Sequence, residues 1–175
     1  MLERQKWEKP ELPQTGHSKT PADTITSDLR TRSNTLSLWR IENKEDLTKA
    51  VLALAVGRNQ ITRLDVMILD QVEFEEADLT IEHTPENGHT PLENFHENHY
   101  DLIDMDYQKL GVLSQLIIDN VKNPEKCIRF EKSKMIEILY DAYINQEFEF
   151  EELSNGLQQD LLKAIKRLEK TRQSQ

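Results

Sequence analysis

The chain has 175 residues, of which 37% are hydrophobic and 31% charged, and its formal net charge is −10 at pH 7. This length suits one domain with an extension, and the single cysteine, Cys127, excludes both an internal disulfide and a zinc site made of several thiolates. The N-terminus lacks the apolar stretch of a signal peptide and no apolar run approaches a membrane span, so we expect a cytoplasmic protein with no membrane association.

Residues 1–33 have the composition of an extended or flexible N-terminal arm. Pro10, Pro13 and Pro21 oppose a long helix, and the residues between them are polar and turn-forming. Trp7 is the largest apolar side chain of this segment. The alternative to a free tail is therefore an arm that docks, through Trp7, on the rest of the chain or on a partner.

Residues 34–82 are predicted to form a strand–helix–strand unit. The stretch 35–41 alternates like a strand, and residues 44–56 carry one apolar stripe at helical spacing. Asn43 is the expected N-cap of this helix and Gly57 its stop. Residues 63–71 are an apolar run typical of a central strand, and residues 72–81 continue in strand-like alternation.

Residues 102–175 change to helical periodicity. Helices are predicted at about 102–121, at 133–144, and from 151 or 154 to 171, with an acidic, histidine-containing loop at 83–101 before them. The expected fold class is α+β, with a small mixed strand/helix N-terminal half packed on a C-terminal bundle of three helices. Residues 34–175 are expected to be one domain.

The negative charge is concentrated in one segment. Residues 1–63 have a net charge of +3 and residues 109–175 a net charge of zero, whereas 64–108 hold 13 acidic residues and no Lys or Arg. Such a segment is either a solvated face with a mobile loop or a surface that docks a basic protein through carboxylates and interleaved aromatic anchors. The residues predicted to make that contact are Glu73, Phe74, Glu75, Glu76, Asp78, Glu93, Phe95, Glu97, Tyr100 and Asp101.

The leading functional hypothesis is a non-enzymatic protein-binding module that needs no cofactor. The sequence has no nucleophile elbow and no phosphate-cradling glycine loop, and it contains only five glycines. An acidic docking surface is typical of proteins that cover the nucleic-acid groove of a toxin, a nuclease or a DNA-binding protein. We therefore expect an inhibitor, an immunity or anti-defence protein, or an accessory subunit of a larger complex.

Two alternatives from other classes remain open. A metal-binding protein or metal-dependent hydrolase would use His83, His89, His96 and His99 as ligands with Glu93 or Glu97 as general base, although Pro85, Gly88 and Pro91 interrupt the first part of this segment. A nucleic-acid-associated subunit would use Arg30, Arg32, Trp39 and Arg40, although a pI near 5.0 disfavours direct binding to phosphate.

Overall fold

The computed structural model describes residues 4–8, 20 and 22–172 of the chain, and within them it confirms the α+β class. The three arm prolines Pro10, Pro13 and Pro21 lie outside the described residues. The chain divides into two compact units. The first unit comprises Met1–Leu38, Leu64–His83 and Tyr100–Arg129, and the second comprises Trp39–Arg63, Thr84–His99 and Phe130–Gln175. This division differs from the expected arm at 1–33 and single domain at 34–175.

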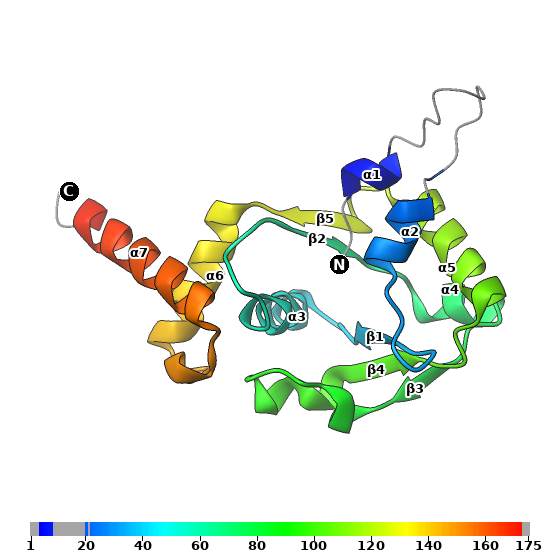
Figure 1. The fold of residues 1–175 in the computed structure, drawn as a ribbon, viewed down its shortest axis with the longest axis horizontal. Helices are drawn as coiled ribbons and strands as arrows, with labels where there is room; N and C mark the ends of the chain where they lie inside the picture. The colour runs from blue at the N-terminus through cyan, green and yellow to red at the C-terminus, as the bar shows by residue number, and fades with distance from the viewer. Residues whose placement is uncertain (1–3, 9–19, 21, 173–175) are drawn as a thin grey trace. The chain divides into compact units, whose positions relative to one another are not determined.

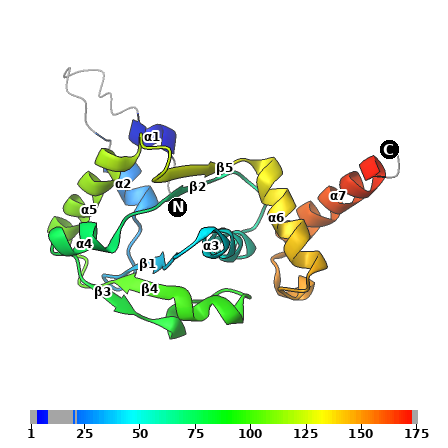
Figure 2. The same ribbon diagram turned by 180° about the vertical axis from the view of Figure 1, so that it is seen from behind.

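Short strands form two small antiparallel sheets (Figures 1 and 2). The strands are β1 (Leu36–Trp39), β2 (Leu64–Met67), β3 (Ile81–His83), β4 (His99–Leu102) and β5 (Cys127–Phe130). One sheet has the order β1-β4-β3 and the other pairs β2 with β5. In the β3–β4 pair Ile81 faces Leu102, Glu82 faces Asp101 and His83 faces Tyr100.

The first unit packs four helices with these strands around one apolar core. The helices are α1 (Arg4–Glu8), α2 (Ala22–Asp28), α4 (Gln71–Glu76) and α5 (Tyr107–Asn120). The core gathers side chains from all parts of the unit, among them Trp7, Leu29, Phe74, Leu79, Leu102, Leu113, Ile117, Val121 and Cys127. Burial of this apolar surface is the main stabilising term of such a unit.

Within residues 1–33, Arg4–Glu8 and Ala22–Asp28 form helices α1 and α2, whereas residues 29–33 are not helical. Trp7 on α1 is only 1% exposed, and its indole N–H donates a hydrogen bond of 2.8 Å to Asp28 Oδ2 on α2. The backbone N–H of Arg4 also donates to Asp65 Oδ2 at 3.1 Å. These contacts dock α1 and α2 into the first unit, since a buried indole and a buried carboxylate satisfy each other.

The second unit is mostly helical. Its elements are α3 (Lys44–Val56), the 3₁₀ helices η1 (Pro85–Asn87), η2 (Glu93–Asn98) and η3 (Phe150–Glu152), α6 (Lys132–Ile144) and α7 (Asn155–Arg172). As predicted, Asn43 caps α3, its side chain accepting hydrogen bonds from the N–H groups of Glu45 and Asp46, and Gly57 ends the helix. Helices α3, α6 and α7 pack in sequence, with Leu139, Leu157 and Leu161 fully buried.

Three predicted elements differ from the structure. Residues 71–76, predicted as part of a strand, form helix α4 because Asp70 and Glu73 make a reciprocal capping box. The expected loop at 83–101 contains η1, η2 and the start of β4. The helical half is interrupted by strand β5, which pairs with β2 and in which Cys127 is buried.

Candidate functional site

Most carboxylates of the acidic segment 64–108 lie at the surface. Ten of its 13 acidic residues are exposed, and they are Asp70, Glu75, Glu76, Asp78, Glu82, Glu86, Glu93, Glu97, Asp104 and Asp106. The other three are Asp65 and Asp101, which are buried, and Glu73, which is half-buried. Since the segment has no Lys or Arg of its own, its exposed side chains carry negative charge alone.

The less exposed carboxylates Asp65 and Glu73 stabilise the first unit. Arg129 donates to both Asp65 oxygens, at 2.7 and 3.0 Å. Glu73 accepts hydrogen bonds from Lys126 at 2.6 Å and from Asn120 at 3.0 Å, and it caps the backbone N–H of Asp70. Partial burial alone would raise the pKa of Glu73, but these hydrogen bonds together hold that pKa below its ordinary value. The hydrogen bond to Glu73 raises the pKa of Lys126 in turn.

Among the predicted contact residues of the first unit, three offer an accessible charge. Glu75 and Glu76 are exposed at the end of α4, and Asp78 is exposed in the turn that follows, where its φ is 55°. Phe74 on the same helix is a core residue with 5% exposure. It therefore anchors α4 in the unit and does not form part of its surface.

Tyr100 and Asp101 lie on β4 with reduced exposure. The Tyr100 ring is half-buried, with its centroid 4.7 Å from that of His83 on the paired strand β3. Asp101 is 2% exposed. Neither residue presents the free aromatic or charged surface that the sequence suggested.

The second unit carries the remaining predicted contact residues on η2. Glu93 and Glu97 are exposed, whereas Phe95 is 5% exposed and stacks on Trp39 with ring centroids 5.2 Å apart. The rings of Trp39 and His99 are nearly perpendicular, with their centroids 5.0 Å apart. Phe95 thus belongs to an aromatic cluster with Trp39 and His99, whereas Glu93 and Glu97 of the same 3₁₀ helix remain exposed.

Tyr107, which is not among the predicted contact residues, is the most exposed large apolar side chain among the described residues of the first unit. Tyr107 is 89% exposed at the first position of α5. Asp106 caps this helix by accepting the N–H of Lys109 at 2.8 Å, and Asp104 and Asp106 are both exposed.

The four histidines of the acidic segment are divided between the two units, with His83 in the first and His89, His96 and His99 in the second. His99 is buried and its Nδ1 donates to the carbonyl oxygen of Thr84 at 2.9 Å, while His96 Nε2 donates to the carbonyl of Thr90 at 2.8 Å. His83 packs on Tyr100 in the first unit. The part of the chain that the structure describes contains no group of three or more His, Cys, Asp or Glu that could hold a metal ion. The geometry therefore gives the metal alternative no support.

The nucleic-acid alternative divides between the units. Arg30 and Arg32 are exposed in the first unit, whereas Trp39 and Arg40 belong to the second. One face of the Trp39 indole is covered by Phe95, and Arg40 forms an ion pair with Glu42. A base cannot stack on the covered face, so this set does not resemble a stacking platform.

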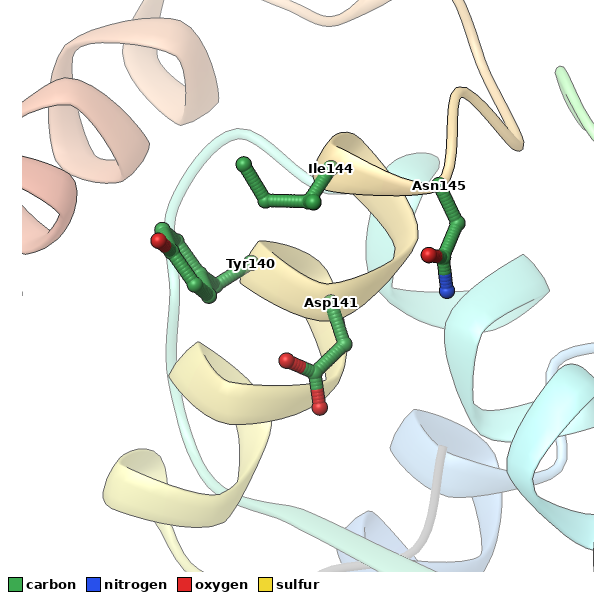
Figure 3. Close-up of a pocket in the computed structure, with 4 residues that line it drawn as sticks. All are labelled: Tyr140, Asp141, Ile144 and Asn145. Atoms are coloured by element: carbon green, nitrogen blue, oxygen red, sulfur yellow. The ribbon is translucent and has the colours of Figure 1, made fainter.

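A small hollow on the second unit is lined by Tyr140, Asp141, Ile144 and Asn145 (Figure 3). All four residues belong to α6 or its C-cap, and they offer one carboxylate, one amide and one phenol. No base or nucleophile faces the carboxylate in this set. The hollow therefore does not form a catalytic constellation.

Comparisons with protein-family models, with curated proteins and with solved structures found no match to this chain. Among the described residues, no helix combines the length and the apolar character needed to cross a bilayer.

Proposed function

We propose that the protein is a non-enzymatic cytoplasmic binding module that docks a basic protein partner through the carboxylates of segment 64–108. Its action on that partner would be that of an inhibitor, an immunity or anti-defence protein, or an accessory subunit. The observation that carries the proposal is the exposure of ten carboxylates within 45 consecutive residues that contain no Lys or Arg.

The electrostatic cost of this arrangement supports a role in binding. Like charges at the surface repel within a Debye length of about 8 Å at physiological ionic strength, and this repulsion destabilises the folded chain. A basic partner removes the repulsion and is steered to the surface, which raises the association rate. Asp65 and Glu73 are engaged within the first unit, so the exposed group at Glu75, Glu76 and Asp78 is the strongest candidate for contact.

The exposed aromatic Tyr107 gives this surface an anchor that the buried Phe74 and Phe95 do not provide. A tyrosine offers a large, rigid contact area and a ring face on which an arginine of the partner can stack. Its neighbours Asp104 and Asp106 attract the same cationic groups. A patch that combines carboxylates with one open aromatic ring fits an arginine- or lysine-rich surface.

Charge reversal on α4 tests the proposal. Glu75→Lys and Glu76→Lys together raise the net charge by four while placing lysines near a helix C-terminus, where they suit the helix dipole. Immobilised wild-type protein is expected to retain a basic protein from a lysate of its own cells at low salt. The double variant is expected to retain much less, and about 0.5 M salt should release the partner from the wild type.

The matched control is Glu151→Lys with Glu152→Lys on η3, which makes the same charge change at exposed positions of the second unit. Equal retention by the control and the wild type would assign the effect to the acidic segment. Retention that resists high salt, or that both double variants weaken alike, would contradict a specific acidic docking surface.

A further inference from the structure

The outward face of α5 is a continuous exposed stripe. Gln108, Gly111, Val112, Gln115 and Asp119 are all exposed. Gln108, Val112, Gln115 and Asp119 follow one another at intervals of four, three and four residues, while Gly111 is adjacent to Val112 and Tyr107 is adjacent to Gln108. The opposite side of the helix is buried through Leu113, Ser114 and Ile117. Side chains spaced in this way lie on one face of a helix, so the six exposed residues form a single surface.

This stripe carries little charge for a solvent-facing helix surface. Charged residues make up 31% of the chain, yet Asp119 is the single one among the six residues of the stripe, and it accepts a hydrogen bond of 2.8 Å from Gln115. Tyr107 and Val112 are 89% and 40% exposed. A surface that has few charged residues and an exposed aromatic residue resembles the centre of a protein interface in its composition.

Gly111 lies near the middle of the stripe, and no packing contact of the described residues requires a glycine there. A Cβ atom built at Gly111 would meet nothing within 4 Å. Glycine inside a helix costs about 1 kcal/mol relative to alanine, and here the fold gains nothing in return. A glycine is useful at such a position when the backbone of another chain must approach the helix closely.

We propose that the outward face of α5 binds a basic segment of the partner, with the partner backbone packed against Gly111 between Tyr107 and Val112. This inference rests on the proposed function and names the part of the surface that holds the partner. Asp106, the N-cap of α5, and Asp119 on the face lie at the two ends of the helix, 13 residues or about 20 Å apart along its axis. The partner segment therefore carries cationic residues about 20 Å apart with small or apolar residues between them.

A second copy of the chain fits this face less well than a basic partner. Two antiparallel α5 helices would bring Asp106 of each copy towards Asp119 of the other, and like charges in such a pair repel. Arginine or lysine at those positions would instead form ion pairs, and an arginine can stack on the open ring of Tyr107. Charge complementarity thus selects the basic segment.

A peptide-display selection on the intact protein tests the assignment. The probe is a library of random peptides of about 15 residues, long enough as a helix to span the face. Selected peptides are expected to contain at least two basic residues, and their affinity should fall about tenfold or more on Gly111→Leu and on Tyr107→Ala. Gln159→Leu, which adds the same side chain to an exposed position of α7, is the control and should leave affinity unchanged.

The variant Gly111→Leu is expected to fold, because leucine favours the helix and the added side chain meets open space. Thermal unfolding at or above the wild-type temperature confirms this. The proposal is overturned if no peptide is enriched, if the selected peptides lack basic residues, if Gly111→Leu binds them as the wild type does, or if sedimentation shows a dimer that Gly111→Leu dissociates. Loss of the cellular partner on charge reversal in α4, with no effect of Gly111→Leu, would overturn the α5 face alone and leave the proposed function standing.

Discussion

Gly156→Ala is expected to destabilise the second unit, although alanine is the better helix former. Gly156 lies in the first turn of α7, and a Cβ atom there would lie 2.2 Å from the carbonyl oxygen of Asn59, where contacts under 3.0 Å are essentially never seen. The loop backbone would have to move by about 0.8 Å, and overpacking of this kind costs about 1–3 kcal/mol. The movement also strains the 2.8 Å hydrogen bond from Ser154 Oγ to the carbonyl of Arg58, which contributes about 1 kcal/mol.

Helix propensity offsets up to about 1 kcal/mol of this cost, so the net loss in the free energy of unfolding is about 2 kcal/mol. Chemical denaturation followed by circular dichroism measures it. Gly111→Ala on α5 is the matched comparison, because its Cβ meets nothing within 4 Å and the substitution should add about 0.5–1 kcal/mol. A neutral or stabilising effect of Gly156→Ala, or a shift of stability in the same direction by both substitutions, would contradict the close packing of the Asn59 carbonyl on Gly156 of α7.

Three further predictions concern the first unit. Glu73→Gln should lower the free energy of unfolding by about 1 kcal/mol near neutral pH. The folded-state pKa of Glu73 lies below its ordinary value. The contribution of Glu73 to stability is therefore fully present at a pH above the unfolded-state pKa and disappears as the pH falls through the folded-state pKa. The denaturation curves of wild type and variant should accordingly converge in acid. Trp7→Phe should cost about 1–3 kcal/mol in thermal or chemical unfolding, because it removes the donor to the buried carboxylate of Asp28; a neutral result would place α1 outside the core. Cys127 is 1% exposed and should react with a thiol reagent only at the rate of unfolding, whereas rapid labelling of the native protein would contradict its burial.

The elements that the sequence predicted well are those whose signals are local. Helix α3 has its N-cap, its apolar stripe and its terminal glycine within 15 consecutive residues, and all three act as expected in the structure. Strands β1 and β2 likewise lie within the ranges 35–41 and 63–71 that were predicted as strands. These signals need no knowledge of the rest of the chain, because caps and periodicity act within one element.

The main error in secondary structure came from giving alternation more weight than capping. Val72 and Phe74 alternate with acidic residues as a strand would, but they lie on helix α4, where Val72 is 57% exposed and Phe74 is buried. The spacing of Asp70 and Glu73 already fits a capping box, which is a helix signal. In a run of six residues a two-residue period is weak evidence, and the polar residues that start a helix discriminate better.

The candidate site shows which surface properties can be inferred from a sequence. Charge is a property of each residue, and lysine-free acidic segments cannot neutralise themselves, so the exposure of ten carboxylates agrees with the composition of the segment. The burial of an aromatic ring depends on distant contacts: Phe95 is covered by Trp39, 56 positions earlier in the chain. Tyr107 remains exposed because α5 begins at that residue and its ring has no element to pack on. The docking surface is therefore best sought where an uncharged helix face, Tyr107 to Gln115, lies between exposed carboxylates, since charge steers a partner while a desolvated contact holds it.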